Sequence, residues 1–100
     1  CFYTAKDFEF DILTYRSEKV RKAASFALER SNTALKDYCE LIRPYEGKPL
    51  NSIPDTVLHE SAGKMKIREC FLKAYKKLEK QYNVIDKRMD EILQEKHSLL

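Results

Sequence analysis

"PYEGKPLNSIPDTVLHESAG", residues 44–63, decides the fold, because it contains every proline and glycine of the 100-residue chain. Proline removes a backbone donor and clashes with the preceding helical turn, and glycine costs backbone entropy. The sequence on either side contains neither residue, so both flanks can continue as helix without interruption. The pattern predicts an all-α protein: a long antiparallel helical hairpin, coiled-coil-like, with the option of a short helix between its two long helices.

The predicted boundaries follow from local capping and breaking signals. We expect a single domain over residues 1–100, with a helix at about 5–43, a connection at about 44–54 and a helix at about 55–99. Thr4 is expected to cap the first helix, with Asp7 three residues later in a capping-box arrangement. Asp55, directly after Pro54, is a good N-cap for the second helix. Gly63 marks a point at which the second helix could break.

Each flank carries one stripe of residues spaced alternately three and four apart. This is heptad spacing, which keeps one face of a helix turned toward a partner helix. The first stripe consists of Phe10, Leu13, Ser17, Val20, Ala24, Ala27, Ser31, Ala34, Tyr38, Leu41 and Tyr45. The second consists of Ile67, Phe71, Tyr75, Leu78, Tyr82, Ile85, Met89, Ile92, Lys96 and Leu99. The two stripes predict a closed hairpin or, if the connection stays extended, two chains that exchange helices with nearly the same contacts.

"DFEFDILTY", residues 7–15, can be read as a strand or as a helix, because Phe8, Phe10 and Ile12 alternate with acidic residues. A strand would need a second strand for its backbone groups, and the chain offers no convincing one. The continuity with the heptad pattern favours a helix. In that helix, Phe8, Ile12 and Tyr15 form a second apolar stripe, which one partner helix cannot cover.

Apolar residues gather where the two ends of the chain meet in a hairpin. Excess apolar surface of this kind predicts association with a protein partner, most simply another copy of the chain or a larger helical assembly. The predicted interface consists of Phe8, Phe10, Ile12, Leu13, Tyr15, Tyr82, Ile85, Met89, Ile92 and Leu93. The alternative is that residues 1–8 fold back, or that a third short helix covers the stripes.

Basic residues gather halfway along the predicted rod. The predicted basic patch consists of Lys19, Arg21, Lys22, Lys73, Lys76, Lys77 and Lys80. Such a belt could bind an acidic lipid surface or nucleic acid, which is the alternative function. The simpler interpretation is a solvated lysine face with local ion pairs. No aromatic residues alternate with these lysines, which disfavours single-stranded nucleic acid in particular.

No motif in the chain indicates catalysis. "HESAGK", residues 59–64, begins like the H-E-x-x-H zinc motif but has Gly63 where the second histidine is required. We therefore expect no enzyme, no cofactor, no metal ion and no small-molecule substrate. The expected function is a protein–protein interaction or scaffold module.

The cysteines indicate a reducing compartment. Cys1, Cys39 and Cys70 are odd in number and match no metal-binding spacing, so no disulfide framework is expected. This favours an intracellular protein, cytoplasmic or nuclear. Cys70 is expected to be a buried or half-buried structural residue. The chain begins at Cys1 without a methionine, as an excised or processed product would.

Overall fold

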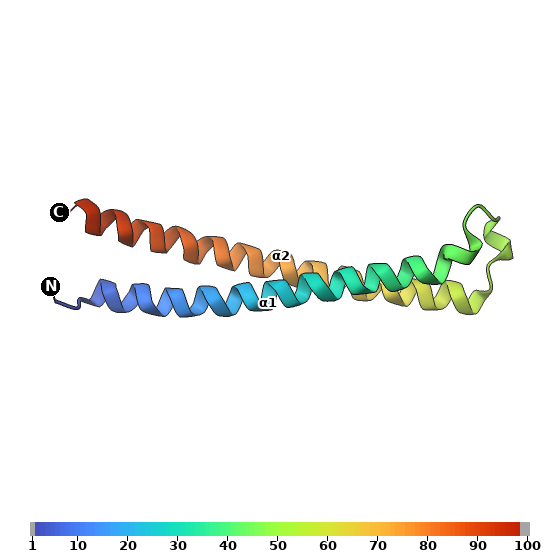
Figure 1. The fold of residues 1–100 in the computed structure, drawn as a ribbon, viewed down its shortest axis with the longest axis horizontal. Coiled ribbons are helices and arrows are strands. Elements are labelled where there is room, and N and C mark those ends of the chain that lie inside the picture. Colours follow the sequence, from blue (N-terminus) through green and yellow to red (C-terminus); the bar gives the residue numbers. More distant parts are fainter. Residues whose placement is uncertain (1, 99–100) are drawn as a thin grey trace.

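The protein is an antiparallel helical hairpin, drawn as a rod in Figure 1. The computed structural model describes residues 2–98, and the rod measures 72 × 18 × 14 Å. Its elements are helix α1 (Ala5–Ile42), two 3₁₀ turns (Arg43–Tyr45 and Leu50–Ser52) and helix α2 (Asp55–Ser98). Both ends of the chain lie at one end of the rod, here called the open end, and the connection forms the tip (Figure 1). The predicted all-α hairpin is confirmed.

The start of α1 is fixed by the expected capping box. Thr4 has an extended backbone, and its hydroxyl oxygen accepts a hydrogen bond from the Asp7 N–H at 3.2 Å. The Asp7 carboxylate accepts one from the Thr4 N–H at 2.8 Å. Two backbone donors that no earlier carbonyl can reach are thereby satisfied. Residues 7–15 are helical, so the helical interpretation of this stretch is confirmed.

The breaking residues of the connection act largely as expected. Helix α1 ends at Ile42, and Pro44 lies in the 3₁₀ turn that follows. The chain then turns at Gly47, whose φ of +75° lies in the left-handed region that favours glycine.

Two expectations for the start of α2 need correction. Asp55 is the first helical residue rather than the N-cap, because the Pro54 carbonyl already accepts hydrogen bonds from Val57 and Leu58. The carboxylate of Asp55 still lies in the first turn, where it complements the helix dipole. Helix α2 also continues through Gly63 without a break. One glycine costs about 1 kcal/mol, which the rest of a 44-residue helix can outweigh.

The core is a thin seam between α1 and α2. At the open end, Leu13, Ile85 and Ile92 are buried together, with partly buried hydrophobic side chains packed against them. Toward the middle and the tip the buried residues are small: Ala27, Ser31, Ala34 and Ser61. Small side chains allow two helix backbones to approach closely. A two-helix seam leaves the outer face of each helix in contact with solvent.

Candidate interaction surface

The structure divides the predicted interface into an inner and an outer set. Six of its residues lie on the seam between α1 and α2: Phe10, Leu13, Tyr82, Ile85, Met89 and Ile92. All six are buried or half-buried, so the hairpin itself uses them and they add little to its exposed surface. The other four, Phe8, Ile12, Tyr15 and Leu93, are exposed. The apolar surface that remains for a partner is therefore narrower than the sequence predicted, and three of its four residues lie on α1.

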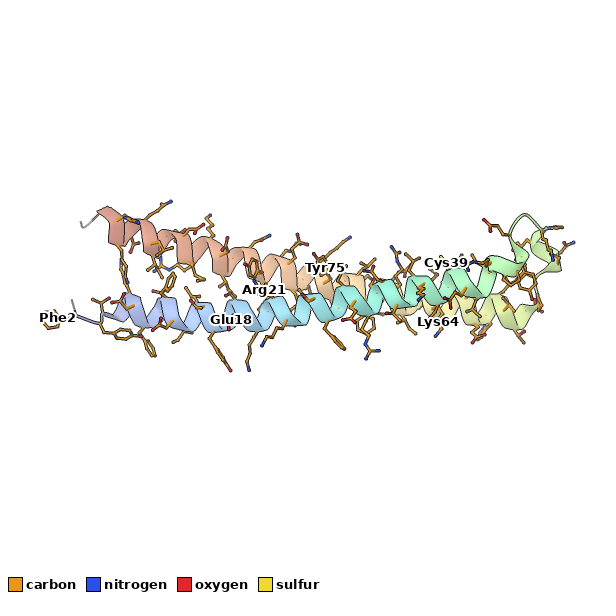
Figure 2. The ribbon with its side chains drawn as sticks, in the orientation of Figure 1. Phe2, Glu18, Arg21, Cys39, Lys64 and Tyr75 are labelled. Atoms are coloured by element: carbon orange, nitrogen blue, oxygen red, sulfur yellow. The ribbon has the colours of Figure 1, made fainter. Side chains whose placement is uncertain are left out.

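These three residues belong to a longer row on α1, which we call the outer stripe. It consists of Phe8, Ile12, Tyr15, Lys19, Lys22 and Phe26. The steps of four and three residues keep the row on one side of the helix. Its four apolar side chains are between 42% and 59% exposed. Figure 2 shows side chains projecting along the edge of α1 that faces away from α2.

Phe26 is the member of the outer stripe that sequence reasoning missed. It follows Phe8 by 18 residues, which is five turns of 3.6 residues, so the two share one direction. The signal was present, but basic residues interrupt the apolar pattern between them. The edge of the Phe26 ring meets Phe71 of α2, with the centroids 6.4 Å apart. The Arg30 guanidinium lies 5.1 Å from the same ring, and the Lys19 ammonium lies 4.9 Å from the Tyr15 ring.

The described residues 2–98 leave the apolar side chains of the outer stripe about half exposed. Phe2 is 94% exposed and extends past the end of α1 (Figure 2). Tyr3 reaches back along α1 to donate its O–H to Asp11, but it leaves Phe8 and Ile12 exposed. The two 3₁₀ turns lie at the tip, the far end of the rod from Phe8 and Ile12 (Figure 1). The described part of the chain has no third helix over the stripe, and the fold-back of its N-terminal residues is limited to Tyr3.

A cluster of ion pairs holds the open end together. Glu9 of α1 and Arg88 of α2 form a bidentate pair, with Nε–Oε1 at 2.8 Å and Nη2–Oε2 at 3.1 Å. Arg88 also donates to Glu91 at 3.3 Å. Lys6–Glu95 and Asp7–Lys96 add two further pairs between the helices. The Arg88 guanidinium lowers the pKa of Glu9, and hydrogen bonds to Glu9 and Glu91 raise the pKa of Arg88.

The pairing of Glu9 should make the open end sensitive to acid. A carboxyl whose pKa is lowered on folding stabilises the fold above its ordinary pKa, and this contribution is lost as pH falls through the lowered value. We expect the urea midpoint to fall between pH 7 and pH 3 by more in the wild type than in E9Q. The control is E69Q, which removes an exposed carboxylate of α2 and should keep the wild-type pH dependence. Equal pH dependence in E9Q and E69Q would contradict a contribution from this pair.

The ion pairs also define the register that places the basic patch. Glu9 lies opposite Arg88 near the open end, and Lys64 lies 3.6 Å from Asp37 toward the tip. This register sets residues 19–22 level with residues 76–80. All seven residues of the predicted basic patch are exposed. Residues 16–37 and 64–84 together carry 13 basic and 5 acidic side chains, a net charge of +8.

The open end has the opposite charge. Residues 2–15 and 85–98 carry 4 basic and 7 acidic side chains, a net charge of −3. The rod is therefore acidic at its open end and basic along its middle.

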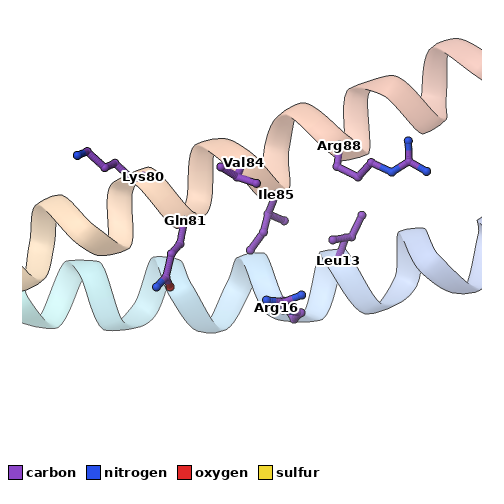
Figure 3. Close-up of a pocket in the computed structure, with 7 residues that line it drawn as sticks. All are labelled: Leu13, Arg16, Lys80, Gln81, Val84, Ile85 and Arg88. Atoms are coloured by element: carbon purple, nitrogen blue, oxygen red, sulfur yellow. The ribbon is translucent and has the colours of Figure 1, made fainter.

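A shallow groove lies where these two regions meet. Leu13 and Ile85 point between the helices there, Gln81 reaches toward α1, and Lys80 points away from it (Figure 3). Arg16 also lines the groove, and neither Arg16 nor Lys80 has an ion-pair partner within residues 2–98. The groove therefore combines an apolar floor with an uncompensated basic rim.

The remaining chemistry-bearing residues form no further site in the described part of the chain. Cys39 and Cys70 are free and exposed, so the expectation that Cys70 is buried or half-buried is wrong. Cys1 lies outside the described residues. Residues 2–98 contain no group of three or more His, Cys, Asp or Glu side chains placed to hold a metal ion. Neither α1 nor α2 offers, over these residues, an apolar stretch that could cross a bilayer.

Comparison with models of protein families, with curated proteins and with solved structures finds no match to this chain.

Proposed function

We propose that this hairpin is a protein–protein interaction module that self-associates through the outer stripe of α1. The observation that carries the proposal is the row of exposed apolar side chains at Phe8, Ile12, Tyr15 and Phe26. Single exposed apolar residues are common on protein surfaces, but several that share one helix face are typical of an interaction site. Self-association would place the module in a larger helical assembly.

The total surface area supports the same proposal. The accessible surface of the chain is 8120 Å². A compact monomer of this mass would expose about 5,900 Å², so the rod exposes about 2,200 Å² more. A stable protein–protein interface buries about 800 Å² from each partner. The excess over a compact monomer is therefore larger than one such interface.

The proposal is tested by removing the apolar side chains of the stripe. In F8S/I12S/Y15S we expect the molar mass in solution to fall to that of one chain while helicity is retained. The matched control is L50S/I67S/V84S, which removes three exposed apolar side chains outside the stripe. This control should keep the mass of the wild type. If both variants kept the wild-type mass, the outer stripe would not be the interface.

A second candidate function is binding to an acidic surface through the basic patch. The net charge of +8 over the middle of the rod favours it, as do the exposed lysines and the adjoining groove with its uncompensated rim. Attraction of this kind is electrostatic and weakens with salt. An acidic membrane and duplex DNA are the two surfaces to test.

We expect K73E/K76E/K77E/K80E to abolish retention on vesicles containing phosphatidylserine or on duplex DNA. The control K36E/R43E/K48E/K87E makes the same change in net charge outside the predicted basic patch and should retain most binding. Cosedimentation with vesicles and gel retardation with DNA measure the two cases. Equal retention of both variants would rule out the basic patch as the binding surface.

A further inference from the structure

We infer that the occupant of the outer stripe is a second copy of this chain, packed antiparallel with α1 against α1 and centred at the level of Ser17. This inference rests on the proposed function and deepens it, because it names the orientation of the two chains and the register. Three observations carry it: the symmetry of the stripe, the charge distribution along the rod and the length of the stripe.

The first observation is that the outer stripe can pair with itself. A two-fold interface brings the same patch of both subunits together, so the patch must be complementary to its own reverse. Reversal of the stripe about position 17 sets Phe8 opposite Phe26 of the partner subunit. It sets Tyr15 opposite Lys19 of the partner subunit and Ile12 opposite Lys22 of the partner subunit.

Each of these pairings is chemically favourable. Two phenylalanine rings can pack edge to face, as Phe26 and Phe71 already do within one chain. An ammonium over a tyrosine ring repeats the Lys19–Tyr15 contact found within the chain at 4.9 Å. The aliphatic part of Lys22 can cover Ile12 while its ammonium extends outward.

The second observation is the charge distribution. The antiparallel arrangement sets residues 5–15 of each chain against residues 19–29 of the other, so each acidic open end meets a basic middle. A parallel arrangement in register would instead set like charges together, which disfavours association. Asp11 has no cationic partner within residues 2–98 and accepts only the Tyr3 O–H, at 2.6 Å. In the antiparallel register it lies beside Lys22 of the partner subunit, which would supply that cation.

The third observation is size. The stripe from Phe8 to Phe26 spans about 27 Å at 1.5 Å per residue. Two α1 helices would therefore meet along about five helical turns.

The charge pairing is tested first by complementation. D11K sets two cations together at both ends of the interface, and K22D sets two carboxylates together. We expect each single variant to raise the dissociation constant about fivefold or more, since two exposed ion pairs are reversed at once. The double variant D11K/K22D should recover the wild-type constant, and so should an equimolar mixture of the D11K and K22D chains. Absence of recovery in both cases would overturn the predicted register.

The direction of the chains is tested by energy transfer between labels. In a C1S/C39S/C70S background, dyes are attached at Q94C near the open end or at K48C at the tip. Along the rod axis, the antiparallel dimer sets the two open-end labels about 30 Å apart and the two tip labels about 90 Å apart. We therefore expect strong transfer between open-end labels and none between tip labels. Strong transfer between tip labels would overturn the antiparallel arrangement.

The proposed function and the register can fail separately. A wild-type chain that remains monomeric overturns both. A dimer that depends on the outer stripe, but shows no charge complementation and transfers energy between tips, overturns only the register. A mass that grows beyond two chains with concentration indicates a head-to-tail contact that does not close, and overturns the two-fold dimer.

Discussion

Replacing Ile92 with alanine is expected to lower the free energy of unfolding by about 2–5 kcal/mol, the range for truncating a buried isoleucine. Ile92 is 0% exposed and packs with Leu13 and Ile85 in the cluster that joins α1 to α2 at the open end. The lost methyl and methylene groups remove apolar burial and leave a cavity. The seam contains few other large buried side chains, so little else can compensate.

The measurement is urea unfolding followed by helicity, at one fixed protein concentration. The matched control is V84A, which truncates a β-branched side chain of the same helix that is 70% exposed. We expect V84A to change the stability by no more than about 0.5 kcal/mol. Similar losses in I92A and V84A would contradict the position of the seam.

Replacing Ser31 with leucine is expected to destabilise the hairpin by about 1–3 kcal/mol, because the extra methylenes do not fit. Ser31 is 1% exposed and lies between Ala27 and Ala34 on the buried face of α1. A leucine there must push α2 away or adopt a strained rotamer. Adding apolar surface to a buried position usually stabilises a fold, so a loss of stability here would show that α1 and α2 pack too closely to admit a leucine.

The matched control is S25L, which makes the same substitution at an exposed position of the same helix. We expect S25L to be neutral or slightly stabilising, because leucine has a better helix propensity than serine. Thermal unfolding of the two variants side by side provides the comparison. If S31L were as stable as S25L, the helices would not meet closely at this level.

The helix boundaries and the seam could be predicted from the sequence, because they depend on residues that are close together in the chain. Pro44 and Gly47 marked the end of one helix and the turn, and Thr4 with Asp7 marked the start of α1. The heptad steps identified the seam, because its period is a local property of each helix. Asp55 was predicted as the N-cap of α2 but is its first helical residue, since the Pro54 carbonyl already accepts hydrogen bonds from the first turn.

The contacts between α1 and α2 could not be predicted from the sequence, because they join residues that are far apart in the chain. Glu9 and Arg88 are 79 residues apart in the chain, and their pairing follows only from the register of the closed hairpin. The division of the predicted interface into seam residues and exposed residues also follows only from the closed hairpin. Phe10 and Phe8 look alike in sequence, but two residues of rotation turn Phe10 toward the seam and leave Phe8 exposed. Cys70 was expected to be covered because cysteine is usually buried, although it lies off the seam.

Self-association through the outer stripe is tested most directly by light scattering. The quantity measured is the molar mass of the wild-type chain across a concentration series. We expect the wild type to form a species of two chains that dissociates only on dilution. The same species should persist in L50S/I67S/V84S, while F8S/I12S/Y15S should have the mass of one chain at every concentration. A helical wild-type monomer at all concentrations would contradict self-association through this stripe, and so would a dimer whose mass is unchanged by F8S/I12S/Y15S.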